Sequence, residues 1–243
     1  MFLNLPINSF WGILGIMGRK VVNGRVSTGI FGLDGKIEGG FERGSISLVA
    51  GSPGTGKSTF AIQFLIDGLS KGENVLYITF EESQEKIFKH MERFGWDLRR
   101  FEKEGKFSFL NYTPERVEKF IAEGGGDIEF YLEKRNIHRV VIDSITYFLL
   151  MSKDEYQSRK ALLELISMLK RVKCSTLMTL ERVPKDYKYA YAEFVADNLI
   201  FLYNKRTNGV KTRMLEVFKM RGTKHPSKLF RIKITDKGIK VYN

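Results

Sequence analysis

Short apolar runs alternate with amphipathic stretches along most of the chain. The apolar runs at residues 46–50, 74–80, 107–110, 139–143 and 176–181 predict buried strands. Residues 57–70, 83–94 and 155–172 have the apolar spacing of helices, and residues 114–136 are expected to be mostly helical with an interruption at the glycines 124–126. Strands that alternate with helices indicate an α/β domain, in which helices cover both faces of a parallel central sheet.

The pattern changes after about residue 197, where only strands are predicted, at 198–203, 211–220, 229–234 and 239–242. The simplest interpretation is a C-terminal antiparallel extension of the same sheet. Because side chains on a strand alternate between its faces, Lys219 and Arg221 should share one face, about 6–7 Å apart. A solvated strand face is the ordinary explanation for such a pair, so its meaning depends on the other motifs.

Composition and charge are those of a soluble globular protein that has a basic surface. The chain has 243 residues, 43% of them hydrophobic and 28% charged, with no repeat or low-complexity tract. The formal charge of +12 favours polyanionic partners such as nucleotides or nucleic acid. A single cysteine, Cys174, excludes an internal disulfide and favours a cytoplasmic location, and its apolar neighbours predict a core residue.

Residues 1–16 form an apolar stretch that lacks a basic n-region and a cleavage site. It is too short for a transmembrane helix and is interrupted by Pro6, Asn8 and Gly12. Three explanations compete: a start codon assigned upstream of Met17, an arm that packs on a neighbour, and a membrane-surface contact. The first is favoured. We therefore expect residues 1–23 to be an arm or a mis-assigned start, and residues 24–243 to be the folded domain.

The loop between the first strand and the first helix matches G-x-x-x-x-G-K-[ST] in full. Its glycines allow backbone N–H groups to curl around phosphate oxygens, and the helix that follows presents its positive end. Lys57 supplies a cation for the β- and γ-phosphates, and the Ser58 hydroxyl can bind Mg²⁺. The motif predicts an ATP site that is formed by Gly51, Ser52, Pro53, Gly54, Thr55, Gly56, Lys57, Ser58 and Thr59.

Carboxylates follow two of the other predicted strands. Asp143 ends the apolar run 140–143 and is a candidate magnesium ligand, because ligands bind at the carboxyl ends of strands in open α/β sheets. Glu81 and Glu82 end the second strand at the same edge, where a carboxylate can deprotonate the attacking water. Their alternative role is a favourable charge at the start of helix 83–94. Glu82 is preferred as the base and Glu81 as its support, and the choice between them stays open.

These motifs, in this order, resemble the KaiC-like branch of the RecA-type ATPases over residues 24–243. The segments that carry the resemblance are TGIFGLD (28–34), GSPGTGKS (51–58), TFEES (79–83), FGWDL (94–98), VIDS (141–144), LER (180–182), FVADN (194–198) and KMRGT (219–223). The resemblance implies a RecA-like P-loop ATPase core with a mostly parallel central sheet, flanking helices and a C-terminal antiparallel extension. It also implies a homo-oligomeric ring, usually a hexamer, that binds ATP between subunits.

In such a ring, Lys219 and Arg221 would reach the γ-phosphate held by the neighbouring subunit, and Thr223, His225 and Asp236 would lie near that nucleotide. The chain departs from the cyanobacterial clock protein, which has two such domains in tandem, so a circadian role is not carried over. The second domain of the clock protein phosphorylates itself on a Ser-Thr pair. Glu193 and Phe194 stand at the corresponding place here, so we expect ATP hydrolysis without autophosphorylation at that place.

Two other classes of function are compatible with the sequence. A nucleic-acid-dependent ATPase of the recombinase or helicase kind would use the loop 183–191, where lysines alternate with Tyr187, Tyr189 and Tyr191. A solvated loop is the preferred interpretation of that segment. An ATP-gated assembly module with little hydrolysis, as in archaellum motor components, ranks third. His90 and His138 have no metal-ligand partners at useful spacing, and no motif indicates the target of the ATPase.

Overall fold

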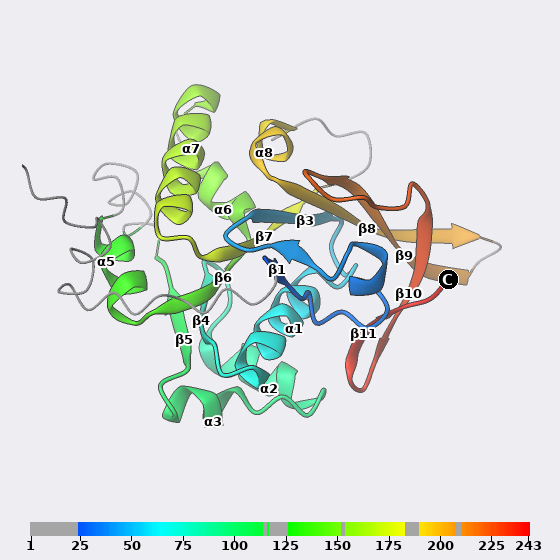
Figure 1. Cartoon of the computed structure of the whole chain (residues 1–243), viewed down its shortest axis with the longest axis horizontal. Coiled ribbons are helices and arrows are strands. Elements are labelled where there is room, and N and C mark those ends of the chain that lie inside the picture. Colours follow the sequence, from blue (N-terminus) through cyan, green and yellow to red (C-terminus); the bar gives the residue numbers. More distant parts are fainter. Residues whose placement is uncertain (1–23, 114–115, 117–125, 152–153, 183–189, 208–209) are drawn as a thin grey trace, which may run out of the picture.

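The computed structural model describes residues 24–113, 116, 126–151, 154–182, 190–207 and 210–243. Within these residues, a 9-stranded sheet has the order β11-β10-β9-β8-β3-β7-β6-β4-β5 (Figure 1). Its parallel strands are β3 (Ile46–Gly51), β4 (Asn74–Thr79), β5 (Phe107–Asn111), β6 (Ile137–Asp143), β7 (Ser175–Glu181) and β8 (Asn198–Thr207). The antiparallel strands are β9 (Val210–Met220), β10 (Leu229–Thr235) and β11 (Gly238–Val241). The predicted mostly parallel sheet with a C-terminal antiparallel extension is confirmed.

Helices cover the two faces of the parallel part of the sheet (Figure 1). The first face carries α1 (Lys57–Ser70), α2 (Gln84–Glu92) and α3 (Leu98–Lys103). The second carries α5 (Gly126–Lys134), α6 (Ile145–Leu150), α7 (Glu155–Arg171) and α8 (Ala190–Val195). The buried side chains form two hydrophobic clusters, one on each face, and strands β9–β11 contribute only to the cluster on the α1 side. The far face of β9–β11 therefore takes no part in the core.

The first helix is tied to both ends of the described chain. An N-terminal segment pairs β1 (Arg25–Val26) with β2 (Phe41–Glu42), and Phe31 forms a bridge to Lys240 in β11. Gln63 of α1 donates to the carbonyl oxygens of Gly29 (2.7 Å) and Ile239 (3.2 Å) and accepts from the Ile239 N–H (2.6 Å). The position of α1 thus depends on residues that are far apart in the sequence.

Arg139 of β6 is the centre of a buried ion-pair network. Its side chain is 1% exposed and pairs with Glu73 and with Asp67 (2.9 Å). The same guanidinium donates to the carbonyl oxygen of Phe64 (2.8 Å) and lies 4.7 Å from the centre of the Phe64 ring. It therefore connects β6 with α1 at the end of the sheet opposite the P-loop.

We expect Arg139→Met to lower the free energy of unfolding by about 3 kcal/mol, because it removes the buried cation that pairs with both Glu73 and Asp67. Urea unfolding should show a lower midpoint with an unchanged slope. The matched control is Lys160→Met, since the Lys160–Glu164 pair is exposed and contributes at most about 1 kcal/mol. Equal midpoints for the two variants would contradict a structural role for the network.

Candidate active site

The phosphate loop connects β3 to α1 and bends around its own lysine. Gly54 and Gly56 have φ values of 74° and 109°, in the left-handed region that favours glycine. The Lys57 ammonium is 8% exposed and donates to the carbonyl oxygens of Gly51 (3.0 Å) and Ser52 (3.3 Å). Within this chain the lysine therefore lies against the backbone of the loop that is expected to hold phosphates.

The strand order gathers carboxylates around Lys57. Strand β7 lies between β3 and β6, and its last residue, Glu181, pairs in register with Gly51. The Glu181 carboxylate lies 3.9 Å from the Lys57 ammonium. Burial lowers the pKa of Lys57, and the negative charges of Glu181, Asp143 and Glu81 oppose this shift. These three carboxylates, from the ends of three different strands, surround the lysine.

Asp143 is held by two hydroxyl groups. The Tyr77 hydroxyl donates to one carboxylate oxygen (2.6 Å) and the Thr179 hydroxyl donates to the other. Burial and the charge of Asp143 raise the pKa of Tyr77 well above its ordinary value, so this hydroxyl keeps its proton. The oxygens of Asp143 and Ser58 are the donor type that Mg²⁺ prefers, and Mg²⁺ commonly takes only one or two protein ligands besides substrate phosphates. The described residues contain no group of three or more His, Cys, Asp or Glu that could form a larger metal site.

The two candidate bases have different surroundings. Burial raises the pKa of Glu81, and the negative charges of Glu181, Asp143 and Glu82 raise it further, while Lys57 opposes them. The Glu82 carboxylate instead lies 2.7 Å from the ammonium of Lys86 on α2. This geometry favours Glu81 as the group that faces the site, in contrast to the preference for Glu82 drawn from the sequence.

Lys219 and Arg221 share one face, as the alternation predicts, and a β-bulge decides which face it is. Val217 pairs with Ile200 and Lys219 pairs with Leu199, so Phe218 is the extra residue. The bulge turns Lys219 towards α8, where its ammonium donates to the carbonyl oxygens of Glu193 (2.9 Å) and Phe194 (3.1 Å). Arg221 also donates to the carbonyl oxygen of Phe194 (3.0 Å). Burial and the charge of Arg221 lower the pKa of Lys219, against the opposing charge of Asp197.

These two cations lie away from the phosphate loop of their own chain. Lys219 pairs with Leu199, and Leu199 pairs with Leu48, three residues before Gly51. That separation is about 10 Å along the strand direction alone. A cavity of about 860 Å³ extends from Gly51 and Ser52 past α8 to Lys219. Phe194 and Phe218 line it and are 74% and 57% exposed.

The remaining predicted nucleotide contacts fall in two places. The Thr223 hydroxyl, close after Arg221, accepts from the Arg25 guanidinium (2.6 Å), and His225 follows it on the same segment. Asp236 is exposed in the turn between β10 and β11. Ile234, just before that turn, packs so close to Gly56 that a Cβ there would lie 3.0 Å from its Cδ1. The turn with Asp236 thus lies beside the phosphate loop of the same chain, apart from Thr223 and His225.

Two polar residues at the site were not assigned a role from the sequence. Glu181 belongs to the LER segment, but its place between Lys57 and Asp143 depends on a strand order that the sequence does not reveal. Arg213 of β9 donates to the carbonyl oxygen of Gly54 (3.4 Å) and adds a cation beside the phosphate loop. No motif in the sequence indicates a role for Arg213.

Several other predictions can be located. Cys174 is buried in the core, as expected, and the Nδ1 of His138 accepts from the backbone N–H of Asn74 (3.2 Å), which is a structural contact. Tyr191 is buried, with its hydroxyl 2.6 Å from that of Ser158, and this does not favour the nucleic-acid alternative for the loop 183–191. Tyr187 and Tyr189, like the arm at residues 1–23, lie outside the described residues. None of the described helices combines the length and apolarity needed to span a membrane.

Comparisons with known proteins give a consistent result. A family model described as a KaiC ATPase matches residues 26–243. The chain is 35% identical to the circadian clock protein KaiC3 of Synechocystis, over 88% of this chain but only 44% of that protein, so it spans less than half the length of this relative. It is also 35% identical to the UPF0273 protein of Pyrococcus furiosus, over 90% of this chain and 94% of that protein. The crystal structure of a KaiC-like protein from Pyrococcus horikoshii superimposes with a TM-score of 0.82 at 36% identity, covering 90% of this chain and 99% of that one.

Proposed function

Because the chain belongs to the KaiC family of ATPases, we propose that it binds Mg·ATP on its phosphate loop and hydrolyses the ATP between subunits of a homo-oligomeric ring, most simply a hexamer. The observation that carries the proposal is that the site within one chain is incomplete. The phosphate loop, Lys57 and three carboxylates are together in one chain, whereas Lys219 and Arg221 donate to backbone carbonyl groups of α8. A second copy would bring its own cations to the γ-phosphate.

Within one subunit, the residues have separable roles. Lys57 exchanges the carbonyl oxygens of Gly51 and Ser52 for phosphate oxygens when ATP binds. Ser58 and Asp143 would hold Mg²⁺, which would supply positive charge beside the β- and γ-phosphates. Tyr77 and Thr179 fix the orientation of Asp143 by their hydrogen bonds.

Glu81 is the proposed general base. The oxygen of a water molecule attacks the γ-phosphorus, the Glu81 carboxylate accepts the proton of that water, and the bond to the ADP oxygen breaks. The raised pKa of Glu81 suits this task, because a base is most effective when its pKa is closer to the working pH. Glu82 keeps its contact with Lys86 and braces the start of α2.

The nucleotide is proposed to have contacts from two subunits. Its own subunit supplies the phosphate loop, Arg213 and the turn with Asp236, which lie side by side in one chain. The neighbouring subunit supplies Lys219 and Arg221, with Thr223 and His225 close to them. Exposed Phe194 and Phe218 flank these cations, and exposed hydrophobic side chains near an incomplete site are typical of a protein–protein contact.

A combined measurement of molar mass and phosphate release tests the proposal. We expect light scattering to show a several-fold larger particle with Mg·ATP than without nucleotide, and we expect steady release of inorganic phosphate. A particle that stays monomeric while it hydrolyses ATP would overturn the ring. Assembly without phosphate release would instead identify an ATP-gated assembly module.

Incubation with ATP labelled at the γ-phosphate provides a further readout in the same experiment. We expect no label on residues 190–196, because Glu193 and Phe194 offer no hydroxyl group and the hydroxyl of Tyr191 is buried against that of Ser158. Label in that segment would contradict the assignment as an ATPase without autophosphorylation.

The family match to residues 26–243 supports residues 24–243 as the ATPase domain.

A further inference from the structure

One face of the C-terminal strands is not covered by any described helix. On the α1 side, β10 and β11 bury Phe230, Ile232, Ile239 and Val241 in the core. The alternating residues point to the other side, where Arg231, Lys233 and Lys240 are exposed. The hydrophobic cluster beneath α5–α8 contains no residue of β9–β11, so this side of the extension is an open sheet surface. We call Arg231, Lys233 and Lys240 the cationic face.

The cationic face places like charges directly against each other. Lys233 pairs in register with Lys240 across the two strands, and Arg231 lies about 6–7 Å from Lys233 on the same side. Like charges at directly opposite positions destabilise a sheet. None of the ion pairs among the described residues includes these three cations. The sheet therefore carries a repulsion that an anion bound on this side would relieve.

An aromatic ring contacts both lysines. The ammonium groups of Lys233 and Lys240 lie 5.6 and 5.4 Å from the centre of the Tyr242 ring, within the range of a cation–π contact. The ring is half-buried and follows directly on β11. A second like-charge pair, Arg206 opposite Lys211 on the β8–β9 hairpin, lies on the α1 side with Leu202 and Leu215 and is not part of the cationic face.

We propose that the cationic face binds the backbone phosphates of single-stranded nucleic acid. Cations interleaved with an aromatic ring on an open surface are typical of proteins that follow a single strand, and an extended sheet suits a polymer with repeated charges. The formal charge of +12 adds a long-range attraction for the same ligand. The cationic face shares no residue with the loop 183–191 or with the residues that are proposed to hold ATP.

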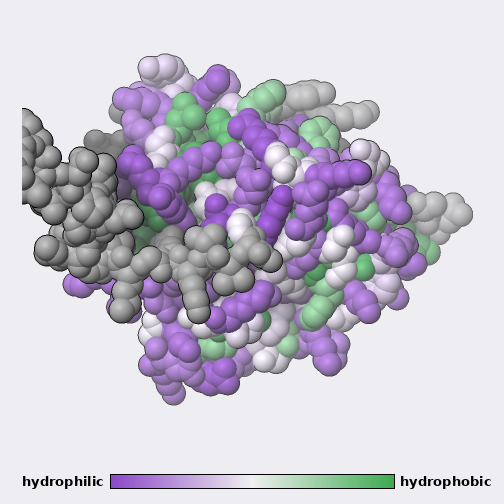
Figure 2. Space-filling view, in the orientation of Figure 1, coloured by the Kyte–Doolittle hydropathy of each residue, from purple (hydrophilic) through white to green (hydrophobic). Residues whose placement is uncertain are grey.

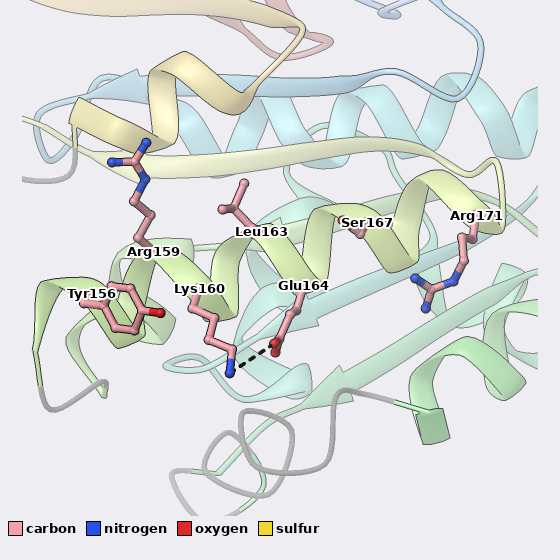
Figure 3. A pocket seen from close by; sticks show the side chains of 7 residues that line it. All are labelled: Tyr156, Arg159, Lys160, Leu163, Glu164, Ser167 and Arg171. Atoms are coloured by element: carbon pink, nitrogen blue, oxygen red, sulfur yellow. Dashed lines mark ion pairs between the residues drawn. The ribbon is translucent and has the colours of Figure 1, made fainter.

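A second basic surface on the molecule makes a useful comparison. A groove of about 530 Å³ along α7 is lined by side chains that include Arg159, Lys160 and Arg171 (Figure 3). There Lys160 lies 3.9 Å from Glu164, and Arg171 lies 2.8 Å from Glu129, so carboxylates offset its charge. The visible face of the molecule is also mostly hydrophilic with small separate hydrophobic areas (Figure 2). The cationic face therefore differs from the α7 groove because Lys233 and Lys240 have no carboxylate partner among the described residues.

The test is the binding of fluorescently labelled 20-nucleotide oligo-dT and oligo-U, followed by anisotropy without ATP at several salt concentrations. We expect the full chain to bind at least one of them, with an affinity that falls as salt rises. The double variant K233Q/K240Q should weaken binding on the order of tenfold at low salt. It should also reduce the slope of log affinity against log salt by about 1.4, because two phosphate contacts are lost.

Two further variants complete the design. R159Q/K160Q on α7 makes the same change in net charge and should leave the affinity within about twofold of the wild type. K233R/K240R keeps the charges and should bind like the wild type. This result would show that K233Q/K240Q loses affinity because it loses charge, and not because the two side chains are replaced. Since all measurements omit ATP, their result is independent of the proposed ATPase activity.

Any of four results would overturn the proposal. The first is that neither oligonucleotide binds, and the second is that K233Q/K240Q and R159Q/K160Q lose the same amount of oligonucleotide affinity. The third is that a poly-glutamate peptide binds and the oligonucleotides do not. The fourth is that K233Q/K240Q has a changed molar mass with Mg·ATP. The third would identify an acidic protein as the partner. The fourth would identify the cationic face as a contact between subunits.

Discussion

Replacing Arg221 by alanine should lower the rate of ATP hydrolysis by about 10³-fold or more, while ATP still binds and stabilises the protein. The guanidinium lies with Lys219 near α8 and not near the phosphate loop of its own chain. If it serves the neighbouring subunit, its loss removes the charge that stabilises the transition state but leaves the phosphate loop intact. Phosphate release and a nucleotide-dependent shift in melting temperature measure the two effects separately.

A mixing experiment shows whether Arg221 acts on its own site or on the neighbouring one. Arg221→Ala subunits have an intact phosphate loop, and Lys57→Ala subunits have intact Lys219 and Arg221, so mixed rings contain some complete sites. Activity should therefore reappear on mixing two inactive variants. Arg99→Ala, which removes an exposed arginine on α3, is the matched control and should hydrolyse ATP at the wild-type rate. Wild-type turnover by Arg221→Ala would defeat the role, and no recovery on mixing would place Arg221 in its own site.

Glu81→Gln should reduce the rate of hydrolysis by about 10²–10⁴-fold, whereas Glu82→Gln should change it by less than about tenfold. The reason is that Glu81 lies in the field of Lys57, Asp143 and Glu181, and Glu82 is paired with Lys86. Single-turnover phosphate release with ATP already bound measures this step. A larger loss in Glu82→Gln than in Glu81→Gln would restore the assignment drawn from the sequence.

The pH dependence gives a second readout of the same base. A base must be deprotonated, so the rate should fall as the pH drops through the pKa of Glu81, and this fall should begin above the ordinary glutamate value of 4.5 because that pKa is raised. Glu181→Gln removes the negative charge that contributes most to the shift after burial. The acid limb of the profile should then move to lower pH. If the acid limb of Glu181→Gln lies at the same pH as that of the wild type, a group other than Glu81 controls the fall in rate.

The sequence predicts those parts of the site that depend on local order. The phosphate loop, Asp143 and the glutamate pair each follow an apolar run directly, and a strand end is a local property. The role of Glu181 depends on β7 lying between β3 and β6, and a sheet order is set by packing between distant segments. The choice between Glu81 and Glu82 depends on how the chain turns into α2, which period-two alternation does not describe.

The C-terminal strands illustrate the same limit. Strict alternation correctly places Lys219 and Arg221 on one face, because both follow the bulge. It would also place Lys219 on the face of Val217, and the extra residue Phe218 reverses that direction. The short helices α3, α6 and α8 were missed as well, since six residues are too few to show a helical period.

The position of β8 has a consequence for how the protein is made. Strand β3 leads into the phosphate loop, and on one side its neighbour is β8, which follows it by about 150 residues in the chain. Until β8 has been synthesised, β3 is an edge strand with unpaired backbone groups, which other chains can join. Gln63 of α1 can form its hydrogen bonds with Ile239 only after nearly the whole chain has been synthesised. A nascent chain therefore has its phosphate loop next to an unpaired sheet edge for most of its synthesis. Truncation near the C-terminus should lower the solubility of the protein as well as disturb the nucleotide site.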